Sequence, residues 1–184
     1  MELTSTSVGP SGVVFTFPPL GWQRCNMGRC LYHHNAIFRA AVDDCASCCD
    51  PLLPQPLVAV LYPDDAPDCH DPLLRPTHAL PAIFAVEYGL YALCVFDACT
   101  PCAVVGHSLG EFVAAVAAGV LTLPVACALV CARAVAMDAM PPLGSMVSLK
   151  YPVELAHALI AATDLESRVV IACACSPLVH APLP

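Results

Sequence analysis

Apolar positions repeat with two different periods along this chain, and the periods predict strands and helices in alternation. Residues 13–17 (VVFTF) form a β-branched and aromatic run that ends at two prolines, which is typical of a buried strand followed by a loop. Behind Asn35, a residue type favoured as a helix N-cap, residues 36–49 carry apolar side chains at helical spacing. Residues 81–96 are almost wholly apolar and predict a buried helix with Pro81 in its first turn.

A second strand is predicted at residues 103–105, directly before a turn flanked by glycines. The helix that follows the turn begins at Glu111, and a further helix is expected over residues 124–137. Residues 50–76 hold seven prolines, so this segment predicts a loop with at most a short helix near residues 57–61.

The pattern changes after residues 141–144 (PPLG), which mark a boundary. Residues 145–150 alternate like a strand, 153–162 repeat like a helix and 168–174 alternate again, which predicts one β-α-β unit. The predicted division is a disordered N-terminus (1–12), a large α/β domain of parallel strands and flanking helices (13–142), and a smaller incomplete module (143–184).

The composition is unusually apolar, with 58% hydrophobic residues and 12% charged residues, against about 45–50% and about 25% in ordinary domains. Residues 112–132 contain no charge, and this run is long enough to cross a bilayer. Gly119, Thr122 and Pro124 instead indicate a helix stop, a cap and a restart. We therefore expect two buried helices and no membrane, with a transmembrane span as the alternative.

The net charge of -8, with only seven Lys and Arg residues, excludes a basic surface for nucleic acid. The first twelve residues are polar and lack a secretory signal, so a cytoplasmic location is expected. Free thiols are the simpler interpretation of the thirteen cysteines, because their number is odd. No metal is expected; a zinc or redox role of the CxxC pairs Cys45/Cys48 and Cys99/Cys102 is the alternative.

The segment GHSLG, from Gly106 to Gly110, satisfies the G-x-S-x-G pattern between a predicted strand and a predicted helix. This context indicates a nucleophile elbow that exposes Oγ of Ser108, with an ordinary strand-to-helix turn as the alternative. The following helix N-terminus favours a developing oxyanion, and the amide of Leu109 is the expected first donor.

A serine nucleophile needs a base, and the sequence shows no obvious one. His107 is adjacent to Ser108, but neighbouring residues on an elbow point apart, so an orienting or packing role is expected. His180 is a candidate by elimination only. The remaining histidines are expected on the surface or in packing contacts: His33, His34, His70, His78 and His157.

Three ordered segments, PAIFAVEYGLYAL, AVVGHSLGEFVAAVAAGVLTL and ALVCARAVAMDAMPPLGSMVSL, resemble the acyltransferase domains of polyketide synthases and malonyl-CoA:acyl-carrier-protein transacylases. The resemblance extends from Val13 to about Ser176. It implies an α/β-hydrolase-like large subdomain and the first β-α-β of a ferredoxin-like small subdomain.

The resemblance also implies a reaction. Ser108 would carry a malonyl-type acyl group from malonyl-CoA, the substrate, to the phosphopantetheine thiol of an acyl carrier protein, beside other synthase domains and with no bound cofactor. Arg133 would anchor the acyl carboxylate, and its alternative is a pair with Asp138 or solvent. The amide of Leu20 would join that of Leu109 in the oxyanion hole.

This chain also departs from the family. Leu20 and Leu80 stand where glutamines are expected, and Pro19 replaces a glycine. The family's catalytic histidine lies beyond the last residue, so no residue here inherits its role. A catalytically incompetent fragment and a general serine hydrolase are therefore the alternatives to an active acyltransferase.

Overall fold

The computed structural model describes residues 12–63, 72–141, 144, 146–147, 149–163, 165 and 167–174. The chain divides into two compact units, Met1–Pro141 and Pro142–Pro184. The predicted disordered N-terminus lies outside the described residues, apart from Gly12.

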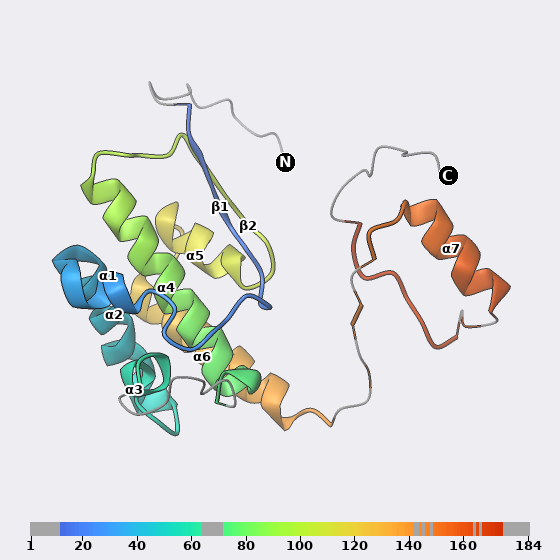
Figure 1. The fold of residues 1–184 in the computed structure, drawn as a ribbon, viewed down its shortest axis with the longest axis horizontal. Helices are drawn as coiled ribbons and strands as arrows, with labels where there is room; N and C mark the ends of the chain where they lie inside the picture. The colour runs from blue at the N-terminus through green and yellow to red at the C-terminus, as the bar shows by residue number, and fades with distance from the viewer. Residues whose placement is uncertain are drawn as a thin grey trace. The chain divides into compact units, whose positions relative to one another are not determined.

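Two parallel strands form the sheet of the first unit. β1 (Val14–Phe17) pairs with β2 (Ala103–Gly106), and Phe17 lies opposite Gly106 at their carboxyl ends. Parallel neighbours need a long crossover, and here helices α1 to α4 lie between the strands in sequence (Figure 1). The two predicted strands and the α/β architecture are confirmed.

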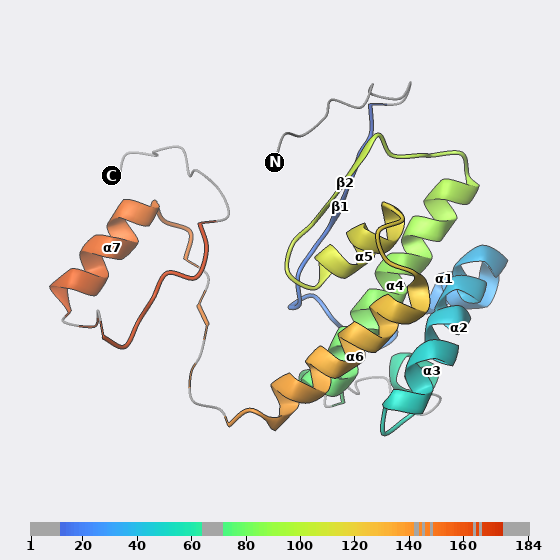
Figure 2. The same ribbon diagram turned by 180° about the vertical axis from the view of Figure 1, so that it is seen from behind.

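Three helices form the main packed layer beside this sheet. They are α2 (Ala36–Cys49), α4 (Pro76–Phe96) and α6 (Leu123–Ala139), and each packs against the other two (Figure 1 and Figure 2). The smaller elements are α1 (Arg29–His34), α3 (Leu57–Leu61), α5 (Gly110–Ala117) and single 3-10 turns at Asp50–Leu52 and Pro72–Leu74. The short helix expected in the proline-rich segment is thus α3.

Helix α2 begins as the sequence predicts. The Asn35 side-chain oxygen accepts hydrogen bonds from the amides of Ile37 at 3.0 Å and Phe38 at 2.9 Å. These bonds satisfy two amides that lack an intrahelical partner in the first turn. The predicted N-cap is confirmed.

Helix α4 begins earlier than predicted. It starts at Pro76, which takes the tolerated first position, and Pro81 lies inside the helix instead of in its first turn. Because Pro81 has no amide hydrogen, the carbonyl one turn before it loses its usual donor. In the described part of the chain, α4 is also long and apolar enough to cross a membrane. Much of it is buried against α2 and α6, as in a core helix of a folded domain.

The charge-free run at residues 112–132 is not one helix. It contains most of α5 and the first half of α6, which are separated by a turn at which Gly119 has a φ of 71°. Thr122 precedes α6 and Pro124 stands in its first turn. The predicted stop and restart are confirmed, and the run does not form a single helix that could span a bilayer.

The strands of the β-α-β unit predicted for the second unit are not seen among its described residues. Helix α7 (Val153–Ala162) forms, but the described residues of 145–150 and 168–174 are not strands. Met146 is 88% exposed and Val170 is 82% exposed, so these two apolar side chains are not buried against other described residues. Strand pairing depends on such a neighbour.

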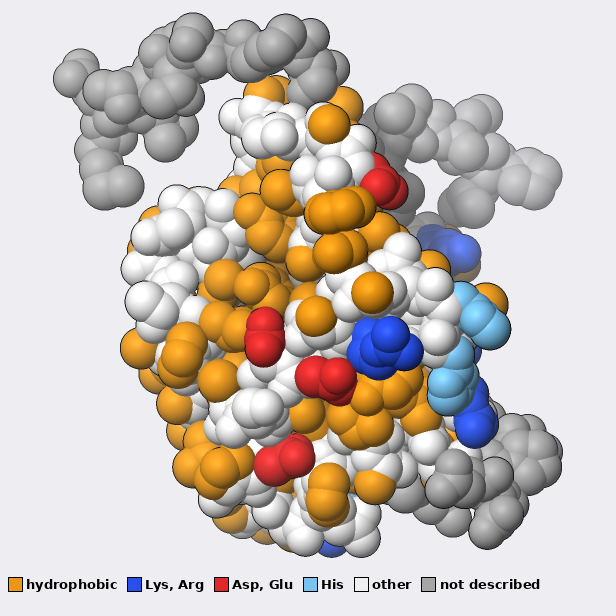
Figure 3. All heavy atoms as spheres, turned by 90° about the vertical axis from the view of Figure 1, so that its left-hand side faces the viewer, with side chains coloured by type: hydrophobic (Ala, Val, Ile, Leu, Met, Phe, Trp, Pro, Cys, Tyr) orange, Lys and Arg blue, Asp and Glu red, His pale blue; other side chains and the backbone are white. Residues whose placement is uncertain are grey.

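The surface of the first unit reflects the low charge content. Figure 3 shows one face on which groups of hydrophobic side chains alternate with backbone and uncharged polar atoms, and charged side chains are few. Val105 is 55% exposed on β2, and Phe96 is 67% exposed at the end of α4. Apolar side chains are therefore not confined to the core.

Candidate active site

The predicted elbow is present at the carboxyl end of β2. Ser108 has a φ of 56°, a left-handed conformation that a residue with a side chain adopts at an energetic cost. The amide of Glu111 donates to the Ser108 carbonyl at 3.2 Å, so helix α5 begins within the turn itself. The serine is half-buried.

Two glycines allow the elbow to lie close to other backbone. A Cβ at Gly106 would overlap the backbone of Glu111, and a Cβ at Gly110 would overlap the carbonyl of Phe17 at the end of β1. The His107 amide also donates to the Phe17 carbonyl, at 3.0 Å. The turn is therefore clamped to the neighbouring strand, and this fixes where Ser108 stands.

Arg133 reaches the serine from helix α6. Its Nη2 donates a hydrogen bond to Ser108 Oγ at 3.1 Å, although 25 residues separate the two in sequence. The guanidinium lies over the ring of Phe112, 6.0 Å from the ring centroid, and this contact holds it in place. Phe112 was not among the predicted site residues; its position four residues after Ser108, one turn along α5, is the sequence signal for it.

The alternative partner of Arg133 is occupied elsewhere. Asp138 forms an ion pair with Arg75 at 3.2 Å and accepts a hydrogen bond from the Thr77 hydroxyl. The hydrogen bond from Thr77, followed by the nearby Arg75 charge, lowers the pKa of Asp138. Arg133 therefore faces Ser108 and not a carboxylate of its own helix.

The backbone amides of the elbow and of the loop after β1 differ in whether they donate a hydrogen bond within the protein. Gly110 donates to the His107 carbonyl at 3.1 Å. Within the described residues, the amides of Leu109 and Leu20 make no hydrogen bond. Leu109 has its side chain buried at 1% exposure, and the half-buried Leu20 packs at the edge of the core.

The described histidines lie in several environments, and none hydrogen-bonds with the Ser108 hydroxyl. His107 is exposed next to the serine, and His33, His34 and His157 are also exposed. His78 is buried in α4, where a packing role was expected. The two remaining candidates, His70 and His180, lie outside the described residues.

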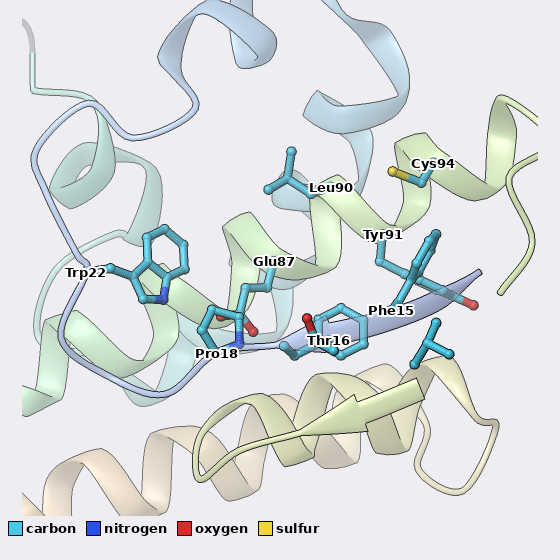
Figure 4. A pocket seen from close by; sticks show the side chains of 10 residues that line it. Phe15, Thr16, Pro18, Trp22, Glu87, Leu90, Tyr91 and Cys94 are labelled. Carbon is cyan, nitrogen blue, oxygen red and sulfur yellow. The ribbon is translucent and has the colours of Figure 1, made fainter. Parts of the chain in front are cut away.

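A pocket of about 370 Å³ lies beside β1, between that strand and α4 (Figure 4). Glu87 from α4 and Trp22 from the loop after β1 line it, and Glu87 is 4% exposed. Neither carboxyl oxygen makes a hydrogen bond of normal geometry within the described residues. Burial raises the pKa of Glu87 to about 8, and the Trp22 indole N–H offsets only part of the rise. Sequence patterns gave no sign of this group.

Metal-binding side chains do not gather into a site for an ion among the described residues. In the two CxxC pairs, all four sulfurs are reduced thiols: Cys45, Cys48, Cys99 and Cys102. The arrangement around Ser108 consists of a positioned hydroxyl, the Arg133 cation and the amide of Leu109 at the start of α5, a combination suited to transfer of an acyl group.

A parallel strand, a tight turn at a serine of positive φ and a helix define the nucleophile-elbow class of α/β enzymes. Residues 14–179 match the family model of the acyl transferase domain. The chain belongs to this family, and the resemblance noted from its sequence motifs is confirmed.

Proteins with similar sequences include large synthases. The chain is 35% identical over 160 residues to the PKS-NRPS hybrid synthetase ATPKS of Aspergillus niger. The aligned segment covers 87% of this chain and 9% of that protein. It is 43% identical over 144 residues to the phenolphthiocerol synthesis polyketide synthase type I Pks15/1 of Mycobacterium marinum. This alignment covers 78% of this chain and 6% of that protein. The chain thus spans less than a tenth of each of these relatives.

Solved acyltransferases share the fold. A loading acyltransferase from the avermectin modular polyketide synthase superposes with a TM-score of 0.81 at 34% identity, over 91% of this chain and 52% of that one. MCAT from Streptococcus pneumoniae gives a TM-score of 0.68 at 29% identity, over 83% of this chain and 48% of that one. The chain therefore shares the fold of acyltransferases of the polyketide synthase and MCAT type. It spans about half of each of these structures.

Proposed function

We propose that this chain transfers a malonyl-type acyl group from malonyl-CoA to the phosphopantetheine thiol of an acyl carrier protein. Ser108 Oγ attacks the thioester carbonyl, its proton leaves with the CoA thiol, and a serine ester remains. The carrier-protein thiol then attacks the ester, and the hydroxyl of Ser108 is restored. No metal or bound cofactor takes part in this scheme.

The observation that carries the proposal is the hydrogen bond from Arg133 to Ser108. A guanidinium within 3.1 Å of a nucleophilic oxygen lies where the free carboxylate of a malonyl ester can reach it. Its planar fork can bind that carboxylate through two parallel hydrogen bonds. A general serine hydrolase has no need of such a cation, so Arg133 favours a carboxylated acyl group.

The two open amides are assigned to the oxyanion. Negative charge develops on the carbonyl oxygen when Ser108 attacks, and the amide of Leu109 stands at the N-terminus of α5. The amide of Leu20 supplies the second donor from the loop after β1. Because both donors are backbone groups, the leucine side chains do not prevent this role.

Partners and location follow from the same scheme. An acyl carrier protein delivers the accepting thiol, and other synthase domains act beside this one, in the cytoplasm. Nucleic acid and membrane have no role in the scheme. The low number of basic residues supports this, with seven Lys and Arg against fifteen Asp and Glu.

A second candidate is acyl-CoA binding without turnover. It is favoured by the lack of a hydrogen bond between Ser108 and any histidine in the described part of the chain. Without a base, the hydroxyl is a weak nucleophile at neutral pH. The two candidates differ in whether an ester forms on Ser108.

The test is to incubate the purified chain with labelled malonyl-CoA and to map the label by mass spectrometry of peptides. Ester formation on Ser108, lost in Ser108→Ala and retained in the control Ser47→Ala, is the expected result. Ser47 is exposed on α2, and its hydroxyl donates a hydrogen bond to the Asp43 carbonyl at 2.9 Å. A wild-type chain that binds malonyl-CoA and stays unlabelled would establish the second candidate instead.

A further inference from the structure

The loop after β1 is tied in two directions by the side chain of Gln23. Its Oε1 accepts a hydrogen bond from the amide of Gly21 at 2.9 Å, within the loop itself. Its Nε2 donates to the carbonyl of Leu73 at 3.4 Å, across 50 residues of sequence. One side-chain amide thus joins two segments that are far apart along the chain.

The acceptor at Leu73 belongs to a well-packed support. Leu73 is 2% exposed. It lies in the 3-10 turn Pro72–Leu74, which precedes α4 and packs against it. Gly21, at the other end of the Gln23 link, is exposed. The bond to Leu73 therefore ties a partly exposed loop to the buried core beside α4.

The backbone of the loop has little structure of its own. In the described part of the chain, residues 18–22 form no backbone-to-backbone hydrogen bond. Pro18 and Pro19 have no amide hydrogen to donate. Gly21 has a φ of 133°, in the region that favours glycine, and glycine restricts a backbone less than any other residue. The loop therefore depends on side-chain contacts for a fixed position, and Gln23 supplies two hydrogen bonds to it.

This loop carries the second donor of the proposed oxyanion hole. Leu20 comes three residues after Phe17, whose carbonyl accepts a hydrogen bond from the His107 amide of the elbow. The Leu20 side chain packs at the edge of the core. Its amide is placed by the backbone on either side, which is clamped to the elbow at Phe17 and tied to the core at Gln23.

We propose that Gln23 is a positioning residue for acyl transfer, whose bond to Leu73 holds the amide of Leu20 where the oxyanion develops. The inference rests on the proposed function, in which Ser108 attacks a thioester carbonyl. Gln23 acts through the loop and does not contact the substrate. An oxyanion donor lowers the barrier only when it is already in place as charge develops. Loss of Gln23 should therefore slow the attack without weakening the binding of the CoA ester.

The position of the loop can be followed without any reaction. Trp22 is adjacent to Gln23 and is the only tryptophan of the chain, so tryptophan emission reports on this loop alone. In Gln23→Ala, acrylamide should quench this emission with a steeper dependence on concentration than in the wild type. Far-UV circular dichroism verifies that the variant is folded.

The rate of Ser108 esterification measures the catalytic consequence. Gln23→Ala should lower the maximal rate by about 10-fold or more, towards the 10²–10³-fold usual for outright loss of one donor. The malonyl-CoA concentration at half-maximal rate should stay nearly unchanged. Acetyl-CoA should show the same fall in rate, because both acyl groups develop the same oxyanion. Arg133→Ala should instead affect malonyl-CoA, so the two variants separate the two roles.

Two further variants keep the result interpretable. Gln23→Glu keeps an oxygen for the Gly21 amide but has no donor for Leu73 at neutral pH, so it should lose rate as Gln23→Ala does. Gln55→Ala replaces the only other glutamine, which is exposed before α3, and should react like the wild type.

The proposal is overturned if Gln23→Ala or Gln23→Glu reacts at the wild-type rate, or if the fall is confined to malonyl-CoA. Unchanged quenching of Trp22 in Gln23→Ala, beside a reactive wild type, would also contradict the role of Gln23. A wild-type chain that forms no ester would contradict the proposed function itself, and the two failures are thereby distinguished.

Discussion

The Arg133 guanidinium and the Ser108 hydroxyl lie 3.1 Å apart, at the meeting point of helix α6 and the turn before helix α5. Each of the two residues is held in this position by a contact with a further residue. The turn is clamped to β1 through Phe17, and the guanidinium is held over Phe112. Because the cation has no carboxylate partner among the described residues, it is available to an anionic substrate.

Arg133→Ala should slow esterification of Ser108 by malonyl-CoA by about 10- to 100-fold, the usual range for loss of a charge-assisted hydrogen bond. Arg133→Lys should recover only part of the rate, since an ammonium cannot bind a carboxylate through a planar fork. Initial rates of label incorporation measure both effects.

Acetyl-CoA supplies the control for this prediction, because its acyl group has no free carboxylate. Esterification by acetyl-CoA should change little in Arg133→Ala. An equal fall with both substrates would contradict the anchoring role and indicate that Arg133 acts on Ser108 alone.

Gly110→Ala should destabilise the first unit by at least about 3 kcal/mol or prevent folding, because the new Cβ overlaps the fixed carbonyl of Phe17. Urea unfolding followed by circular dichroism measures the change. Gly144→Ala is the matched control, since a Cβ there would have no atom within 4 Å. Similar unfolding curves for the two variants would show that β1 does not clamp the elbow.

Local patterns predicted much of the first unit. The cap at Asn35, the strands that became β1 and β2 and the break at Gly119 each depend on a few neighbouring residues, and each is present. The start of α4 was misplaced because Pro76 and Pro81 carry the same helix-start signal, and only packing selects between them. The two strands predicted for the second unit are not seen among its described residues, because alternation alone does not supply a strand to pair with.

The candidate site was predictable to the extent that it follows a motif. Ser108 stands in a recognisable pattern, and its φ of 56° is the conformation that an elbow requires. The contact between Phe112 and Arg133 is long-range, because 21 residues separate the two in sequence. Such contacts depend on how two helices pack, which no local pattern specifies.

Asn35→Ala should lower the free energy of unfolding by about 1 kcal/mol, since two amides of α2 lose their acceptor. Asn35→Asp keeps an oxygen at the cap and should change stability by a few tenths of this amount. Paired urea titrations measure both variants. An alanine variant as stable as the wild type would mean that water replaces the cap at no cost.

Glu87 should make the free energy of unfolding depend on pH. The pH window lies between the pKa of Glu87 in the unfolded chain and its pKa in the folded protein. Folded Glu87 keeps its proton up to about pH 8, whereas the unfolded chain releases it near the ordinary pKa of 4.5. Between these values the folded state binds more protons than the unfolded state. The free energy of unfolding therefore falls as pH rises, by up to about 1.4 kcal/mol per pH unit.

Glu87→Gln isolates this contribution, because an amide of nearly the same shape stays neutral at every pH. The stabilisation by protonated Glu87 is fully present below its unfolded pKa and is lost as pH rises through its folded pKa of about 8. Urea midpoints of both proteins, measured from about pH 5 to about pH 8, should therefore converge at the acid end and diverge at the alkaline end. Histidines titrate in both proteins, so their effect cancels in the difference. A difference that stays constant across the window would mean that Glu87 is ionised in the folded protein and that a partner or solvent compensates its charge beside β1.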